Sequence, residues 1–400
     1  MKRIFILLLV VLLCGCCRVP ITENTEKTSQ QHIENAAYVK SVWIAYYELQ
    51  DMIKDTEASF SKLINKRFKQ LKDMGFNTIT VQVRPCADAF YISAYYPSSK
   101  YCFGCQGVYM PYDPLSVMCD SAHNLGLRIE AWINPYRVSQ DNKIEELCDT
   151  NIAKKWYSTK SKKSHIYVAK NGIFFNPACD DVTRLIVNGV KEIVTNYDID
   201  AIHFDDYFYP TTDKSIDSKE YGLYKSGGGT LSLSAWRRDK VSNMVHSVYS
   251  VIKDTDNNVQ FGISPAANID NNYNSLYADV KKWCTQDGYI DYICPQVYYG
   301  FYSDTMPFMS TVKKWVKLSK KPIYIGLPLY KADTVDRYAS ASNKRAINEF
   351  KNKSNIISRQ IDYIAHFDSI DGYYIFSYNC LLDDNCKKEV SNMMGALSNS

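Results

Sequence analysis

The sequence has little of several features that would narrow its function. Its 47 Lys and Arg residues nearly balance its 43 Asp and Glu residues, and no basic cluster stands out, which argues against a nucleic-acid-binding protein. Only Cys102 and Cys105 have the short spacing of a zinc-binding pair, and a zinc site needs a second such pair or added histidines. The glycine run at 227–229 lacks the lysine and hydroxyl residue that end a phosphate-binding loop. We therefore expect no metal site and no nucleic-acid partner.

Long apolar runs are also missing. The longest is residues 4–13, which follows the basic pair Lys2 and Arg3. A membrane-spanning helix needs about 20 apolar residues, so this run is typical of a secretory signal. It ends in Cys14-Gly15-Cys16, which resembles the bacterial lipobox, where a small residue precedes the cysteine that is acylated. The sequence predicts a lipoprotein signal peptide over residues 1–15 and lipidation of Cys16, hence export and anchoring to a membrane of the cell envelope. An ordinary cleaved signal is the alternative.

The rest of the chain divides into a polar segment and one long folded region. Residues 16–37 show no apolar periodicity and are expected to be a flexible tether. Residues 38–400 are long for one ordinary domain, but α/β barrels commonly exceed 200 residues as a single domain. Export would permit disulfides, and Cys102/Cys105 and Cys380/Cys386 are close in sequence. The sequence indicates nothing about the oligomeric state.

Short strand-like runs alternate with helical patterns from residue 41 onward. The expected strands are residues 41–47, 78–84, 127–134, 201–205, 259–264, 291–297, 322–329 and 372–378. The expected helices are residues 60–74, 114–125, 182–196, 234–253, 307–318 and 354–366, with Gly75 and Gly126 as helix stops. No short hairpin turn joins consecutive strands, so they are expected to be parallel. Eight such units predict an α/β fold of the closed (β/α)8 type, a TIM barrel; an open doubly wound sheet is the alternative.

Polar and apolar residues alternate within the expected strands. In residues 78–84, Thr80, Gln82 and Arg84 lie on one face and apolar residues on the other. A barrel explains this pattern, because apolar side chains face the helices while alternate ones point into the lumen. The strand-end residues are Arg84, Asn134, Asp205 and Gln296. Active sites of such barrels lie at the C-terminal ends of the strands, so we expect these residues to converge there.

The densest functional pattern is residues 203–210, His-Phe-Asp-Asp-Tyr-Phe-Tyr-Pro. Adjacent carboxylates repel each other and lose solvation, which suggests a catalytic purpose; a helix cap plus an ion pair is the structural alternative. Glycoside hydrolysis uses one protonated and one ionised carboxyl group. We predict Asp205 as the ionised group, because cations lie near it, and Asp206 as the acid. The second carboxyl could instead be Glu130, Asp88 or a later loop aspartate, although Glu130 is expected to pair with Arg128 deep in the lumen.

Substrate-binding residues are expected around this pair. They are Arg84, Asp88, Asn134, Tyr136, Arg137, His203, Tyr207, Gln296 and Tyr298. Arginine and amide groups suit sugar hydroxyls or a carboxylate-bearing sugar. The chain has 32 tyrosines, many in expected loops, and an aromatic ring offers a flat face to a sugar. This composition favours a carbohydrate over a small charged metabolite.

Seven motifs in order resemble the glycosyl-hydrolase-like family numbered ten. They are Val81-Gln82-Val83-Arg84-Pro85 with Asp88-Ala89-Phe90-Tyr91, Tyr112-Asp113-Pro114-Leu115, Ala131-Trp132-Ile133-Asn134-Pro135-Tyr136-Arg137, residues 203–210, Trp236-Arg237-Arg238, Phe261-Gly262-Ile263-Ser264-Pro265 and Pro295-Gln296-Val297-Tyr298. This family comprises exported bacterial TIM barrels, including lipoproteins that cut peptidoglycan glycan strands stripped of their stem peptides. The resemblance covers residues 38–378. It implies glycan hydrolysis without an organic cofactor, at a site lined by Arg84, Asn134, Arg137, His203, Asp205, Asp206 and Gln296.

Two positions depart from the family pattern. Glu130 stands where histidine is common, which changes the charge inside the barrel, and Asn176 replaces an aspartate before Pro177. The expected function is a glycoside hydrolase of a cell-envelope polysaccharide, foremost peptidoglycan glycan strands. A surface hydrolase of another polysaccharide and a non-catalytic glycan-binding barrel are the alternatives.

Overall fold

The structure is a computed structural model that describes residues 38–397. These residues belong to one compact unit. The predicted signal peptide over residues 1–15, the lipidated Cys16 and the tether over residues 16–37 lie outside the described residues. No helix within residues 38–397 is long and apolar enough to cross a membrane.

Eight parallel strands form a closed barrel. They are β1 (Val39–Ile44), β2 (Thr78–Arg84), β3 (Arg128–Ile133), β7 (Ala201–Phe204), β8 (Gln260–Ile263), β9 (Tyr292–Ile293), β10 (Ile323–Leu327) and β11 (Ile370–Ile375). The ring closes because β1 pairs with both β2 and β11, which excludes the open doubly wound sheet. All eight predicted strands are present, but β9 has only two residues, since Pro295 follows it and has no backbone N–H to donate. The fold is therefore a (β/α)8 TIM barrel, as predicted.

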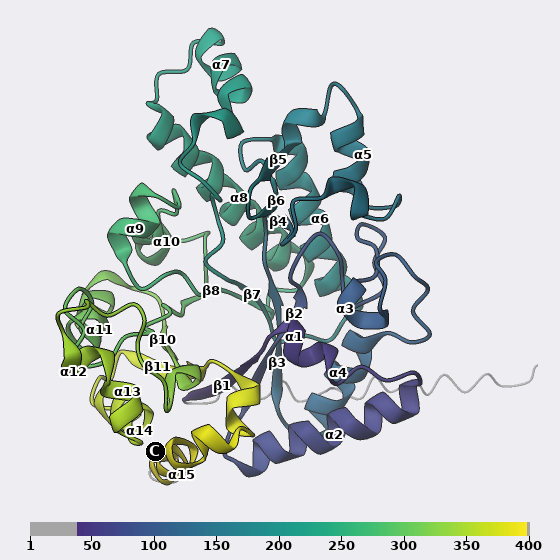
Figure 1. Cartoon of the computed structure of the whole chain (residues 1–400). Helices are drawn as coiled ribbons and strands as arrows, with labels where there is room; N and C mark the ends of the chain where they lie inside the picture. The colour runs from purple at the N-terminus through teal and green to yellow at the C-terminus, as the bar shows by residue number, and fades with distance from the viewer. Residues whose placement is uncertain (1–37, 398–400) are drawn as a thin grey trace, which may run out of the picture. The chain divides into compact units, whose positions relative to one another are not determined.

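Helices flank the barrel on its outer side (Figure 1). The longer ones are α2 (Glu57–Asp73), α4 (Pro114–Asn124), α6 (Asp180–Asn196), α8 (Leu233–Thr255), α11 (Phe308–Leu318), α14 (Ile356–Ile364) and α15 (Lys387–Leu397), and the shorter ones are α1 (Tyr46–Gln50), α3 (Lys100–Phe103), α5 (Ile152–Ser158), α7 (Ser218–Ser226), α9 (Ile269–Asn274), α10 (Val280–Thr285), α12 (Lys344–Ile347) and α13 (Glu349–Asn352). The six predicted helices correspond to α2, α4, α6, α8, α11 and α14. Gly75 and Gly126 follow α2 and α4 with φ of 91° and 66°, the left-handed conformation that ends a helix.

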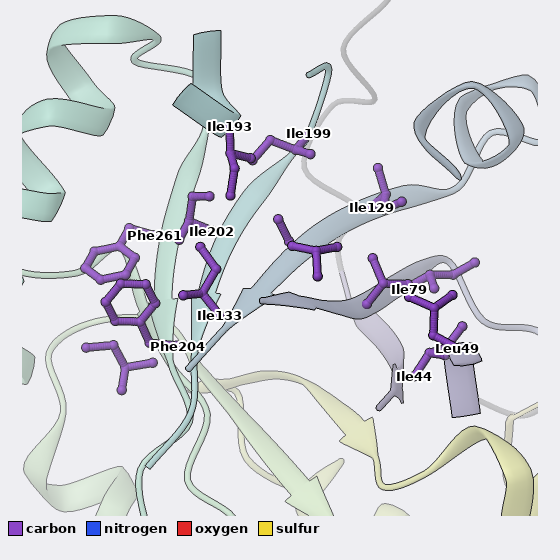
Figure 2. Close-up of a cluster of buried hydrophobic side chains, with 14 of the residues drawn as sticks. Ile44, Leu49, Ile79, Ile129, Ile133, Ile193, Ile199, Ile202, Phe204 and Phe261 are labelled. Carbon is purple, nitrogen blue, oxygen red and sulfur yellow. The ribbon is translucent and has the colours of Figure 1, made fainter. Parts of the chain in front are cut away.

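The main hydrophobic core lies between the strands and the helices. Ile79, Ile129, Ile202 and Phe204 project outward from their strands, and Figure 2 shows them in one cluster of buried side chains that includes Ile193 of α6. A second, smaller cluster fills the lumen and contains Trp43, Trp132, Tyr292 and Tyr374. The alternation predicted from the sequence thus separates two cores, with aromatic residues dominating the inner one.

A register shift alters the end of β2. Gln82 pairs with Trp132, but Arg84 pairs with Ile133, so Val83 is an extra residue between them. Such a bulge moves every later side chain to the other face of the strand. Arg84 consequently packs over the ring of Tyr96 at 4.7 Å, and a Cβ at Gly189 of α6 would touch that ring. The predicted lumen position of Arg84 was therefore wrong.

The segment between β3 and α6 forms a small antiparallel sheet that the sequence analysis did not predict. It consists of β4 (Arg137–Ser139), β6 (Gly172–Phe175) and β5 (Ile166–Ala169), in that spatial order. The sheet holds Asn171 and Phe174 beside the C-terminal end of the barrel, where both line the main cavity. All ten cysteines among residues 38–397 are free, including the pairs considered for disulfides.

Candidate active site

A cavity of about 570 Å³ opens at the C-terminal ends of the barrel strands. Its lining comes from side chains on β1, β2 and β3, from the segments that follow β1 and β7 to β11, and from the small sheet. The lining residues are Trp43, Ala45, Tyr46, Tyr47, Gln82, Trp132, Arg137, Gln140, Asn171, Phe174, Asp205, Asp206, Tyr207, Ser264, Gln296, Tyr298, Tyr330 and Phe376. The barrel thus brings together residues that are far apart in sequence; of the four predicted strand-end residues, Asp205 and Gln296 line the cavity, whereas Arg84 and Asn134 do not.

Asp205 lies at the end of β7 and is only 2% exposed. Its Oδ2 accepts hydrogen bonds from the Trp132 indole N–H at 3.1 Å and from the Asn134 side-chain amide at 3.3 Å. Its Oδ1 faces the backbone N–H of Tyr207 at 3.4 Å. Asn134 is fully buried behind this carboxyl group, so it orients Asp205 and does not line the cavity.

Burial governs the protonation of both carboxyl groups. Burial, followed by repulsion from Asp206, raises the pKa of Asp205 to about 7, against the opposing effects of Arg137 and Trp132. Burial also raises the pKa of Asp206, although a hydrogen bond from Gln296 and the charge of Arg137 lower it. The expectation that nearby cations keep Asp205 ionised is therefore not met. The pair can retain a proton near neutral pH, which suits acid–base chemistry.

Gln296 links Asp206 to the next strand. Its Nε2 donates to the backbone oxygen of Ser264 at 2.8 Å, which fixes the amide beside Asp206. Gln296 lies after the end of β9. Its backbone forms isolated β-bridges with Ala266 on one side and Gly326 on the other, so it still belongs to the barrel wall. Tyr298 follows it and also lines the cavity. Both residues thus lie at the cavity, and their role in substrate binding stays a prediction.

Arg137 and Tyr207 form a stacked pair at the rim. The guanidinium carbon of Arg137 lies 4.0 Å from the centre of the Tyr207 ring. The backbone N–H of Arg137 donates to the Asn134 side chain at 2.9 Å, and Arg137 pairs with Phe174 in the small sheet. Tyr207 is 50% exposed, so the outer part of the pair is accessible to a ligand.

His203 lies below the cavity and does not line it. Its Nε2 accepts from the indole N–H of Trp43 at 3.4 Å, and its Nδ1 meets the Tyr292 hydroxyl at 2.9 Å. Because an indole N–H can only donate, the ring proton belongs on Nδ1. Burial lowers the pKa of His203 to about 3, so the ring is neutral. His203 therefore supports Trp43 from beneath the cavity.

Glu130 lies deeper still, as expected. It is 1% exposed and accepts hydrogen bonds from Thr80 and from Tyr374, each at 2.8 Å. Its charge lies close to Arg128, near the opposite end of the barrel. Glu130 does not line the cavity, which removes it as the second catalytic carboxyl group.

Three further predicted binding residues lie away from the cavity. Arg84 is turned outward by the bulge in β2. Asp88 accepts from Gln106 at 2.9 Å and lines a separate hollow of about 90 Å³. Tyr136, which directly precedes β4, is fully buried in the outer core. None of these three side chains lines the main cavity, so the structure does not bring them together with Asp205 and Asp206 as the sequence predicted.

Most aromatic residues of the cavity lining were not among the binding residues predicted from the sequence. Trp43, Tyr46 and Tyr47 come from the end of β1 and from α1, while Tyr330 and Phe376 follow β10 and β11. Tyr47 and Tyr330 are 44% and 36% exposed, so they offer accessible ring faces together with Tyr207. The alternation within β1 could have identified Trp43, because it puts this side chain on the lumen face. No group of three or more metal-ligating side chains occurs among residues 38–397.

Comparison with known proteins agrees with this geometry. The family model described as Glycosyl hydrolase-like 10 matches residues 38–341. The chain is 32% identical to "Glycosyl hydrolase YngK" of Bacillus subtilis (strain 168) over 320 residues, covering 73% of this chain and 61% of that protein. It is 29% identical to "Glycosyl hydrolase DigH" of Escherichia coli (strain K12) over 361 residues, covering 81% of each.

Solved structures share the fold at low sequence identity. The PgaB (BpsB) glycoside hydrolase domain from Bordetella bronchiseptica aligns with a TM-score of 0.59 and 11% identity, covering 89% of this chain and 99% of that domain. The endo-1,4-beta-mannanase from Rhizomucor miehei aligns with a TM-score of 0.55 and 9% identity, covering 91% and 95%. The motifs, the barrel and the family match over residues 38–341 together show that the chain belongs to the glycosyl hydrolase-like 10 family and is a glycoside hydrolase.

Proposed function

We propose that this enzyme cleaves glycosidic bonds in the glycan strands of peptidoglycan, with Asp205 and Asp206 as its catalytic carboxyl groups. One observation carries the assignment of the two aspartates. Among the described residues that line the main cavity, Asp205 and Asp206 are the only carboxylates. The alternatives considered from the sequence, Glu130 and Asp88, lie outside this cavity.

The chemistry requires a proton on one carboxyl group and a negative charge on the other. The protonated group donates its proton to the glycosidic oxygen as the bond to the anomeric carbon breaks. The ionised group stabilises the positive charge that develops on the sugar, and water supplies the hydroxyl group of the new reducing end. A pair whose pKa values are raised by burial and mutual repulsion can hold one proton at neutral pH, as this division requires.

The cavity lining fits a sugar polymer. Accessible rings of Tyr47, Tyr207 and Tyr330 can pack against the apolar faces of sugar rings, and amides such as Gln140 can bind hydroxyl groups. The choice of peptidoglycan rests on the motif resemblance described above. The rings and amides of the lining favour a glycan substrate, and a peptidoglycan strand is such a glycan.

We further propose that the enzyme is exported and held at a membrane of the cell envelope by lipids on Cys16. The supporting pattern is the short apolar run followed by Cys14-Gly15-Cys16. Cys16→Ala should move the protein from the detergent-soluble membrane fraction to the aqueous fraction, whereas Cys17→Ala should not. Equal partitioning of both variants and the wild type would contradict lipidation of Cys16.

The substrate is tested with purified protein and three kinds of glycan: peptide-free peptidoglycan strands, intact sacculi and a panel of neutral polysaccharides. New reducing ends from peptide-free strands support the proposal. Activity restricted to neutral glycans would replace the substrate but retain the enzyme class. Binding to every glycan without any product would indicate a glycan-binding barrel.

A further inference from the structure

The main cavity is much smaller than a polysaccharide. Its volume of about 570 Å³ lies within the range of sites that take a small ligand, so it can hold only part of a glycan strand. A strand bound at Asp205 and Asp206 must therefore continue across the rim of the barrel. Side chains on the rim would then contact sugars that lie outside the cavity.

An aromatic cluster in the cavity wall marks one side of this rim. It consists of Tyr298, Tyr330 and Phe376, whose ring centres lie 5.7 to 5.8 Å apart. Tyr330 is 36% exposed, and its neighbour Tyr338 does not line the cavity. Burial raises the pKa of Tyr330 most, and the phenol of Tyr338 is near enough to raise it further. The aromatic surface therefore extends beyond the cavity.

A buried ion pair anchors the loop that carries Tyr338. This loop lies between η4 (Leu329–Lys331) and α12. Nζ of Lys331 donates to the backbone oxygen of Tyr298 and to Oδ2 of Asp336, each at 2.8 Å. The other carboxylate oxygen of Asp336 accepts from the backbone N–H of Tyr338 at 3.0 Å. The backbone of Tyr338 is thus fixed to a residue that lines the cavity.

The Tyr338 side chain is nevertheless 81% exposed, and its ring centre lies 5.5 Å from Nζ of Lys331. Isolated exposed rings are common on protein surfaces and need no function. Tyr109 is one such ring, because it is 87% exposed and does not line the cavity. Tyr338 differs in that its backbone is fixed to the cavity wall beside a second accessible ring. A ring held in this way loses little conformational entropy when a ligand packs against it.

We infer that the Tyr338 ring binds the apolar face of a sugar outside the cavity and makes the enzyme prefer long glycan strands to short fragments. The inference rests on the proposed glycan hydrolysis and adds a subsite to it. A strand that reaches from Asp205 and Asp206 to Tyr338 gains a contact that a fragment confined to the cavity cannot make. This contact is remote from the cleaved bond, so it should favour binding of long substrates and leave the cleavage of short ones unchanged.

The test uses one glycan in several lengths. Peptide-free strands are compared with fragments of about two, four and eight disaccharide units from the same preparation. The kcat/KM of wild type should increase with length. Tyr338→Ala should lose about five- to tenfold in kcat/KM on the strands, mainly through KM, since an aromatic contact commonly contributes that much. It should match wild type on the shortest fragment that wild type cleaves.

Two further variants separate the ring from other effects. Tyr338→Phe should keep the preference for long strands, because the ring remains. Tyr109→Ala is the matched control, since it removes a similarly exposed tyrosine and should behave as wild type at every length. Equal activity of Tyr338→Ala and wild type on the strands, or an equal loss at every length, would overturn the inference and leave the proposed hydrolysis of peptidoglycan intact.

The substrate proposal can fail independently of Tyr338. If wild type cleaves only a neutral polysaccharide, the proposed substrate is wrong, and the same length series on that polymer decides the role of Tyr338. If wild type cleaves no glycan, electrophoresis through gels that contain each glycan decides it. Retardation of wild type that Tyr338→Ala reduces and Tyr109→Ala does not reduce supports the inference, and any other result contradicts it.

Discussion

The indole N–H of Trp132 donates a hydrogen bond to Oδ2 of Asp205 over 3.1 Å. Trp132 lies on β3 and Asp205 just after β7, the neighbouring strand, so the barrel pairing brings the donor to the carboxyl group. Because the bond stabilises the ionised form of Asp205, it restrains the rise in pKa that burial causes. Trp132 also lines the cavity, so one residue both orients Asp205 and shapes the substrate site.

Trp132→Phe removes this N–H and retains most of the ring. We expect kcat to fall about tenfold, since the lost hydrogen bond involves a charged acceptor, and the pKa of Asp205 to rise. Steady-state kinetics against pH measure both effects. Trp283→Phe is the control, because its indole donates to Ser242 at 3.1 Å in the outer core. Unchanged kcat in Trp132→Phe would contradict the orienting role.

Removing either carboxyl group should abolish most of the activity. We expect Asp205→Asn and Asp206→Asn each to lose at least about 100-fold in kcat, because an amide can neither donate nor accept the required proton. Asp287→Asn should retain full activity, since Asp287 is an exposed partner of Lys321. Reducing-end release measures the rates, and circular dichroism verifies the fold. Full activity in either active-site variant removes that residue from the mechanism.

The raised pKa of Asp205 should be visible in the pH dependence of the rate. We expect an inflection of kcat/KM near pH 7, since this parameter reports groups of the free enzyme. Arg137 lowers the pKa of Asp205, so Arg137→Gln should move the inflection to higher pH. An ordinary aspartate titrates near pH 4 and would produce no inflection between pH 6 and 8. A flat profile in that range would contradict the buried, coupled pair.

Asp205→Asn should also stabilise the protein at alkaline pH. The folded-state pKa of Asp205 is about 7, against an ordinary value of 3.8, so ionisation opposes folding. The contribution of Asp205 to the free energy of unfolding is therefore fully present below pH 4. This contribution is lost as the pH rises toward 7. The difference in Tm between Asp205→Asn and wild type should increase over this interval, to about 2 °C or more. Calorimetry at pH 4, 6 and 8 tests the trend, and a difference that stays constant would contradict it.

Glu130 is expected to matter mainly for stability. Glu130→Ala deprives the buried Thr80 and Tyr374 of a hydrogen-bond acceptor. Leaving buried hydrogen-bonding groups without their partner costs about 1–3 kcal/mol each. Urea unfolding should show this loss. Glu146→Ala, which removes an exposed partner of Lys143, should change stability little. A Glu130→Ala variant as stable as wild type would show that its charge is not needed in the lumen.

The local pattern of the sequence was sufficient to predict the barrel and the position of its reactive residues. Several strands of the ring, β2 and β3 among them, are short runs with alternating polarity, and the long helices have apolar faces, so local periodicity indicates both. Asp205 and Asp206 directly follow β7, Gln296 and Tyr298 lie in the segment after β9, and the carboxyl ends of parallel strands meet at one rim. Their convergence therefore follows from the barrel topology and requires no knowledge of side-chain contacts.

Tertiary structure decided what the strand pattern could not determine. One extra residue at Val83 turns Arg84 out of the lumen, and an inserted small sheet brings Phe174 to the cavity. The protonation of Asp205 was also outside the reach of sequence, because a pKa depends on solvent exclusion and on charges contributed by distant segments. The sequence by itself determined the eight barrel strands and the six long helices between them. Bulges, inserted segments and burial determined which side chains reach the cavity and in what charge state, since these depend on contacts between residues far apart in the chain.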